Sequence, residues 1–284
     1  MSGVSAPGAR LLRWSILALG FAFLYVPIVV LIVYSFNESR LASVWSGFSF
    51  KWYGELLRDQ SMLDAAWVSL RVAFWTATAS MVIGTMAALA MTRMRQFPTK
   101  TAFGAMITAP LVMPEVITGL SILLMLVSVA GSVGIAPKGV VSIWIAHVTF
   151  TLSFVTVVVS SRLAELDKSL EEAAMDLGAN RIKVFFLITL PIVAPALVSG
   201  WLLAFTLSLD DVVIASFVAG PNSTTLPMKV FSSVRLGLSP KINALATLMV
   251  VAVSVAATVG WWLMYREEKR RQRDIQMALQ SNAE

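Results

Sequence analysis

Six long apolar stretches, separated by short polar segments, dominate the hydrophobic pattern of the chain. A helix needs about 20 apolar residues to cross the hydrocarbon core of a membrane, and every one of these stretches is that long. They cover residues 14–36, 65–92, 102–130, 139–160, 187–209 and 243–265. The first is not followed by a small-residue cleavage site, so we interpret it as a retained span. The pattern predicts an all-α membrane protein with six transmembrane helices in a single domain, residues 1–284.

Composition supports a lipid environment and excludes several kinds of chemistry. The chain is 57% hydrophobic and 13% charged, whereas soluble domains carry about 25% charged residues. It has no cysteine, which excludes disulfides, thiolate metal sites and a cysteine nucleophile. The net charge of +6 could indicate a nucleic-acid partner. The basic residues are instead spread between the apolar stretches and after the last one, so we interpret their placement as topological.

The distribution of Lys and Arg predicts the orientation. Six spans place both termini on one side of the membrane. The polar segments on that side hold 14 basic residues, and the other side has 8, of which Arg71 lies at the mouth of the second stretch. By the positive-inside rule, the termini and the segment 162–186 are cytoplasmic. On the opposite side, Trp52 and Tyr53 favour a short interfacial helix with aromatic anchors, although a plain connecting segment fits equally well.

The cytoplasmic segment has the pattern of a short helix, a tight turn and a second helix. The first helix begins either with a capping box of Ser169 and Glu172 or with Asp167 as its cap. Gly178 is placed to end that helix in a left-handed conformation, and Asn180 to cap the next one. One apolar stripe follows the helical period and consists of Leu170, Ala173, Ala174 and Leu177. The two alanines make the ridge thin, which suits close approach by another protein.

This segment resembles the signature loop of ABC importer permeases. The matching positions are Glu172-Ala173-Ala174, three residues, Gly178, nine residues, Ile188, one residue and Leu190-Pro191. The resemblance implies a type I ABC importer permease fold, in which this loop is the coupling helix that docks on an ATPase subunit. The residues implied in docking are Glu172, Ala173, Ala174 and Gly178, with Glu171 and Asp176 as charged neighbours.

The resemblance extends along the chain and is strongest to permeases of polyamine importers, especially the putrescine system. It is carried by residues 52–57, 109–115 and 208–217. It implies a multi-pass subunit of the bacterial inner membrane that transports putrescine or spermidine. The implied partners are a second homologous permease, two ATPases and a periplasmic binding protein. Permeases for ferric iron or thiamine share part of the pattern, so these solutes remain alternatives.

The energy for transport must come from another protein. The chain contains no Walker A sequence, so we expect no enzyme activity and no bound cofactor, with ATP and Mg²⁺ used by the partner ATPases. The membrane part also lacks paired histidines and clustered metal ligands, and no metal site is expected. His147, the single histidine, is more typical of a packed, hydrogen-bonded side chain than of a proton relay or substrate ligand.

Carboxylates within the apolar stretches are candidates for the substrate pathway. An ionisable group in a span is costly and by default marks a pathway or a partner. The candidates are Glu115, Asp210 and Asp211, with Trp201 and Phe205 as possible cation–π contacts. The alternatives are that the carboxylates cap backbone groups or pair with Arg71 or Arg235, and that the aromatic residues serve in packing. A proton-coupled secondary carrier would also use such carboxylates, but it would leave the cytoplasmic loop without a role.

Two proline-containing segments resemble one another. Residues 108–119 and 189–200 are identical at five of twelve positions, including two prolines in each. Proline frees backbone carbonyls in a membrane helix, so we expect both helices to be kinked. The Asp210-Asp211 pair interrupts a further apolar stretch, which predicts a helix that breaks and then continues.

Overall fold

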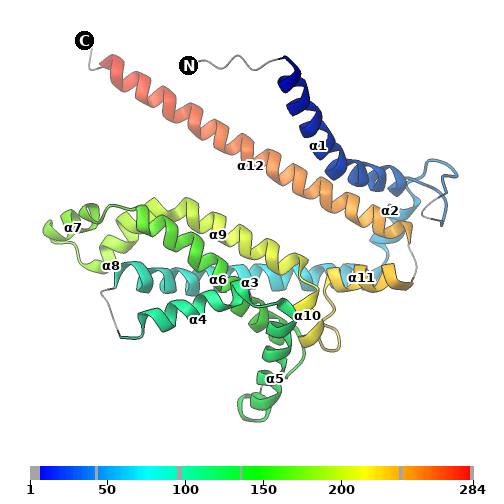
Figure 1. Cartoon of the computed structure of the whole chain (residues 1–284), viewed down its shortest axis with the longest axis horizontal. Helices are drawn as coiled ribbons and strands as arrows, with labels where there is room; N and C mark the ends of the chain where they lie inside the picture. Colours follow the sequence, from blue (N-terminus) through cyan, green and yellow to red (C-terminus); the bar gives the residue numbers. More distant parts are fainter. Residues whose placement is uncertain (1–6, 42–43, 95–97, 135, 237–238, 282–284) are drawn as a thin grey trace. The chain divides into compact units, whose positions relative to one another are not determined.

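A computed structural model of the chain describes residues 7–41, 44–94, 98–134, 136–236 and 239–281. The described residues are mainly helical (Figure 1). In chain order the helical segments are α1 (Pro7–Ser35), α2 (Lys51–Leu57), α3 (Gln60–Arg93), α4 (Lys100–Val112), α5 (Glu115–Val133), α6 (Val140–Glu165), α7 (Lys168–Asp176), α8 (Arg181–Val184), the π-helical turn η1 (Phe185–Thr189), α9 (Leu190–Asp210), α10 (Val213–Val218), α11 (Leu226–Leu236) and α12 (Pro240–Ser281).

Six helical stretches of the described chain are long and apolar enough to cross a membrane. They are Leu12–Ser35, Gln60–Arg93, Glu115–Ser132, Val140–Glu165, Arg181–Asp210 and Pro240–Gly260. Each overlaps one predicted stretch, which confirms the all-α class with six spans. The fifth begins earlier than the predicted residue 187 because α8, η1 and α9 follow one another without a break.

The third predicted span is two helices instead of one kinked helix. α4 ends at Val112, and α5 begins at Glu115 after an extended Met113 with ψ of 136°. The residue before a proline avoids the helical region because its backbone clashes with the proline ring, and Met113 precedes Pro114. In the similar segment of α9 the helix continues through Pro195. The shared prolines therefore produce a break in one segment only.

The chain divides into two compact units, and Gln60–Ser232 forms the larger one. In this unit α3, α6 and α9 pack against one another (Figure 1). Small side chains let α3 and α6 approach closely, as is common between membrane helices. A side chain at Gly84 would lie 2.9 Å from Val155 of α6. The hydroxyls of Ser80 and Thr151, 2.7 Å apart, add a buried hydrogen bond between the same helices.

The second unit comprises Met1–Asp59 and Ser233–Glu284, in which α12 packs on α1 and α2. The short helix predicted at Trp52 is present as α2. Trp52 is buried, and its Nε1 donates a hydrogen bond to the carbonyl oxygen of Asn37 at 2.6 Å. Lys241 of α12 lies 3.7 Å from Glu55 and 3.5 Å from Asp59. Trp52 is therefore an internal packing residue of this unit and not an exposed anchor.

Candidate functional site

The predicted helix–turn–helix lies between α6 and α9 as α7, a turn and α8. Of the two predicted caps, Asp167 is the one that forms, and its side chain accepts a hydrogen bond from the amide of Ser169 at 2.9 Å. This bond stabilises the carboxylate and lowers the pKa of Asp167 from its ordinary value. The capping box of Ser169 and Glu172 does not form, because Ser169 already lies within the helix.

The turn after α7 has the hydrogen bonds of a Schellman motif. The amide of Gly178 bonds to the carbonyl of Met175 at 2.9 Å, and the amide of Ala179 bonds to that of Ala174 at 3.1 Å. Gly178 has φ of +87°, which confirms its predicted left-handed conformation. Asn180 caps α8 with its side chain, as predicted. The local sequence therefore defines the shape of this segment.

One side of α7 and its turn faces outward. The exposed residues include most of those implied in docking: Glu172, Ala173, Asp176 and Gly178. Ala174 is half-buried. Leu177 is 91% exposed, although leucine is apolar. A thin ridge that exposes a leucine and two carboxylates is a suitable surface for a protein partner.

Glu171 differs from these residues because its side chain faces the protein interior. Its Oε2 lies 3.0 Å from Nε of Arg93 at the end of α3. Its Oε1 accepts a hydrogen bond from Oγ1 of Thr189 in η1 at 2.8 Å. The Arg93 and Glu171 side chains are 16% and 15% exposed. One carboxylate thus connects α7 to α3 and to the π-helical turn before α9. From the sequence, Arg93 was only one of the basic residues that predict the orientation in the membrane.

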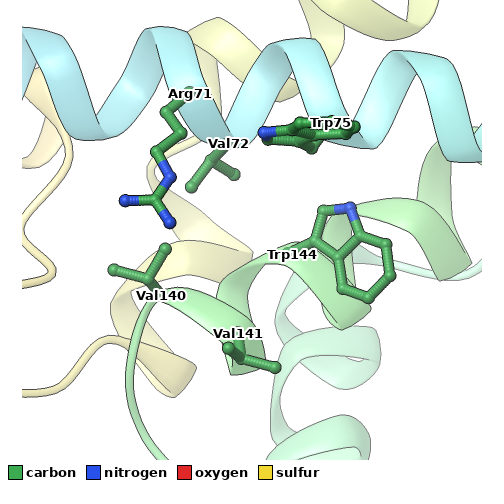
Figure 2. A pocket seen from close by; sticks show the side chains of 6 residues that line it. All are labelled: Arg71, Val72, Trp75, Val140, Val141 and Trp144. Atoms are coloured by element: carbon green, nitrogen blue, oxygen red, sulfur yellow. The ribbon is translucent and has the colours of Figure 1, made fainter.

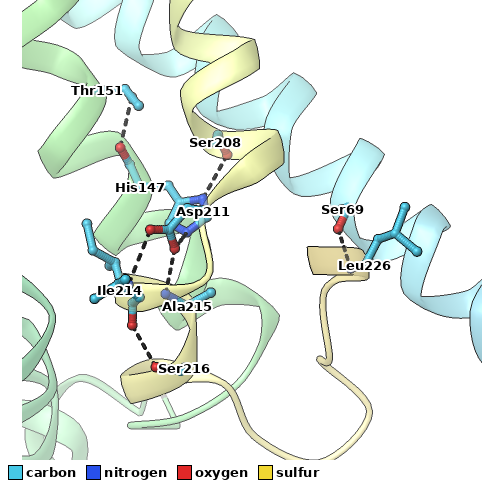
Figure 3. A network of polar contacts seen from close by, with 10 residues as sticks. Ser69, His147, Thr151, Ser208, Asp211, Ile214, Ala215, Ser216 and Leu226 are labelled. Atoms are coloured by element: carbon cyan, nitrogen blue, oxygen red, sulfur yellow. Dashed lines mark hydrogen bonds and ion pairs between the residues drawn. The ribbon is translucent and has the colours of Figure 1, made fainter. Parts of the chain in front are cut away.

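The predicted break after the fifth span is confirmed: α9 ends at Asp210 and α10 begins at Val213. Asp211 lies in the break, and its carboxylate caps α10 (Figure 3). It accepts hydrogen bonds from the amides of Ile214 at 3.2 Å and Ala215 at 2.7 Å. This capping satisfies amides that a helix start leaves without partners.

The same carboxylate contacts His147 of α6. The distance from Asp211 Oδ2 to His147 Nε2 is 3.1 Å, and His147 Nδ1 lies 2.7 Å from the hydroxyl of Ser208 in α9 (Figure 3). His147 is only 1% exposed. The expectation of a packed, hydrogen-bonded histidine is confirmed, and its partner is Asp211. Asp211 itself is buried and has the capping role that was the alternative to a pathway role.

The other pathway candidates are placed differently. Glu115 in the first turn of α5 and Asp210 at the end of α9 are both exposed, and no ion pair to either occurs within the described part of the chain. Trp201 and Phe205 stack on one another at 5.3 Å. Trp201 Nε1 donates a hydrogen bond to Oγ1 of Thr78 in α3 at 3.2 Å. These two aromatic residues thus pack within the larger unit.

No cluster of three or more potential metal ligands occurs among the residues that the structure describes. Two other features carry organised polar groups: the exposed surface of α7 and the broken helix at Asp211. The first is exposed, and the second connects α6, α9 and α10 through hydrogen bonds.

Residues 80–273 match the family model described as "Binding-protein-dependent transport system inner membrane component". The chain belongs to this family. The match includes α7, its turn and the broken helix, so both features are part of the family's region. As a family member the chain is a transport subunit of the inner membrane and not an enzyme.

Curated relatives match nearly the whole permease. It is 60% identical to the putrescine transport system permease protein PotI of Escherichia coli K12, over 94% of this chain and 95% of that protein. It is 41% identical to the spermidine/putrescine transport system permease protein PotC of Haemophilus influenzae, over 90% of this chain and 97% of that protein.

A solved structure supports the fold. A bacterial ABC transporter involved in the import of the acidic polysaccharide alginate matches with a TM-score of 0.71 at 15% identity. The match covers 91% of this chain and 98% of that one. It confirms the predicted permease fold. Its low identity carries no information about the solute of the present permease.

Proposed function

We propose that this permease imports a polyamine, putrescine or spermidine, as part of an ATP-driven transporter. The observation that carries the proposal is 60% identity to a putrescine permease over nearly the full length of both chains. The exposed carboxylates Glu115 and Asp210 suit a solute with two or more ammonium groups, because they offset the cost of removing its water. Asp211 has no place in this pathway, since it is buried in its contact with His147.

The energy would come from two ATPase subunits, one of which would dock on the exposed side of α7. Glu172, Ala173, Asp176 and Gly178 are available for this contact. When the ATPases close, they would move α7, and the Glu171 contacts would carry that movement to α3 and η1. A second permease and a periplasmic binding protein complete the assembly. ATP and Mg²⁺ would be used only by the ATPases.

The proposed orientation places both termini and α7 in the cytoplasm, as the 14 basic residues of that side favour. Fusions to the C-terminus test it. A fluorescent reporter that folds only in the cytoplasm should be active there, and alkaline phosphatase should be inactive. The reverse result would contradict the orientation and the docking of a cytoplasmic ATPase on α7.

The solute is tested with the complete reconstituted transporter. ATP hydrolysis is measured with the binding protein loaded in turn with putrescine, spermidine, thiamine or ferric iron. The proposal expects stimulation by a polyamine. Stimulation by thiamine or ferric iron alone would contradict a polyamine as the solute, but it would still agree with an ATP-driven importer.

A second experiment tests the energy source. The purified permease is placed in proteoliposomes alone, without ATP, and labelled putrescine uptake is followed with and without a proton gradient. We expect no uptake above protein-free vesicles. Uptake driven by the gradient would support a secondary carrier and would leave the exposed side of α7 without its proposed role.

A further inference from the structure

A small cavity lies beside the first half of α3, between α3 and the start of α6. Its volume is about 220 Å³. Figure 2 shows the side chains of Arg71 and Trp75 from α3 above it and Trp144 from α6 at its side. The remaining lining is apolar and consists of Val72, Val140 and Val141. The cavity lies entirely within the larger unit and is separate from α7 and from the His147–Asp211 contact.

The nitrogen-bearing side chains that line this cavity are all hydrogen-bond donors. A guanidinium and an indole N–H can donate but cannot accept. No carboxylate of the described residues pairs with Arg71. Trp144 Nε1 is buried and has no acceptor in the described structure. A buried donor without an acceptor is costly, so the cavity has the chemistry of a site for an oxygen-bearing anion.

The position of the cavity along α3 indicates where that anion comes from. α3 has 34 residues, which corresponds to about 51 Å of helix against about 30 Å of hydrocarbon. Arg71 lies about 17 Å from the start of α3, so its backbone lies roughly 6 Å inside the hydrocarbon boundary. A long arginine side chain reaches that boundary by snorkelling. Trp75 lies one turn deeper than Arg71 and is 56% exposed, so its ring is accessible to an acyl chain.

We propose that this cavity binds the phosphate group of an anionic phospholipid. Arg71 would bind the phosphate oxygens with its planar fork, and Trp144 Nε1 would donate a further hydrogen bond. The valines and the face of Trp75 would contact the glycerol and the first part of an acyl chain. The leaflet is the one at the opposite end of α3 from Arg93 and the coupling helix. A polyamine does not fit this site, because Arg71 would repel its ammonium groups.

The test uses the permease purified with its partner subunits in mild detergent and stripped of lipid. Phosphatidylglycerol is added, and the bound lipid is counted by native mass spectrometry. Arg71→Gln should weaken binding about tenfold, which corresponds to roughly 1.4 kcal/mol. Trp144→Phe removes the indole N–H but keeps an aromatic ring, and should weaken binding about threefold. Arg71→Lys keeps the charge and should have a smaller effect than Arg71→Gln.

Arg181→Gln is the matched control, because Arg181 is a basic residue of the same unit that lies outside the cavity. It should leave the bound lipid unchanged. Equal lipid binding by wild type and Arg71→Gln would overturn the proposal. Competition by inorganic phosphate at the same concentration as the lipid would assign the site to a free anion instead. A further outcome is that the Arg71→Gln complex loses the second permease before any lipid is added. If its lipid binding then equals that of wild type, Arg71 contacts the partner protein and not a lipid.

Discussion

Two pairs of adjacent carboxylates, Glu171-Glu172 and Asp210-Asp211, share one arrangement in different parts of the larger unit. In each pair one side chain faces into the protein and its neighbour faces outward. Glu171 and Asp211 connect helices that are distant in sequence, whereas Glu172 and Asp210 have no ion-pair partner in the described structure. Adjacent acidic residues therefore have separate roles, one structural and one available to a partner or solute.

The two inward carboxylates also differ from each other. Asp211 is buried, contacts His147 and accepts two backbone amides at the start of α10. Glu171 is partly exposed and contacts Arg93 and Thr189. Electrostatic contacts strengthen with burial, and a buried polar group that loses its partners is costly. We therefore expect Asp211 to determine stability and Glu171 to affect mainly the transmission of movement.

The largest effect is expected for Asp211→Ala. The change leaves His147 and two amides of α10 without their partner, and each unsatisfied buried group should reduce stability by about 1–3 kcal/mol. The midpoint of thermal unfolding in detergent, followed by size-exclusion chromatography, measures it. Asp210→Ala is the matched control and should stay within about 0.5 kcal/mol of wild type. Equal destabilisation by the two variants would remove the distinction between the inward and outward side chains.

Gly178→Asp acts on the turn that presents the outward Glu172. A left-handed backbone costs most non-glycine residues about 1–2 kcal/mol but aspartate less, so the main change is the new carboxylate beside the proposed docking surface. The variant should reach the membrane in normal amounts but lose its ATPase subunits in co-purification. Gly178→Asn should retain more of them, because asparagine tolerates this conformation without adding charge. Normal co-purification of the aspartate variant would contradict docking at this turn.

Glu171→Gln should separate ATP hydrolysis from transport. It removes the charge of a partly exposed ion pair, and we expect a stability loss of about 1 kcal/mol or less. The number of solute molecules imported per ATP hydrolysed should fall, because α7 is held less firmly to α3. A double variant with Arg93→Glu and Glu171→Arg exchanges the two charges and should restore part of this ratio. Glu172→Gln should instead weaken ATPase association, and the same outcome for both glutamates would refute their separate roles.

The smallest effect is expected for Asp210→Asn. The side chain is exposed, so the protein should assemble with wild-type stability. Loss of one charge–charge contact in a solvated pathway corresponds to about 1 kcal/mol, or roughly fivefold in the initial rate of putrescine uptake. Uptake at the wild-type rate would place Asp210 outside the pathway.

Local features were predicted correctly where neighbouring residues determine them. The caps Asp167 and Asn180, the left-handed Gly178 and the break at Asp210-Asp211 all depend on residues within one or two turns. The capping box at Ser169 was wrong because Asp167, two residues earlier, provides an equally local alternative. Choosing between two such caps requires knowing where the chain enters the helix.

Long-range pairs could not be predicted in the same way. Glu171 pairs with Arg93 across 78 positions, and His147 pairs with Asp211 across 64. Several basic residues were available to each carboxylate, and the choice depends on how the helices pack. The similar proline segments make the same point. Met113 precedes a break and Ala194 lies within a continuous helix, although a proline follows each.

The sequence by itself determined the six spans, the all-α class, the shape of the coupling segment and the resemblance to importer permeases. These follow from hydrophobic length and from capping, which act over short distances along the chain. Tertiary structure alone decided which carboxylate of each acidic pair is used internally and where Arg71 and Trp144 meet at a cavity. These depend on side chains that approach only when α3, α6 and α9 pack, because contacts between distant residues form only in the folded arrangement.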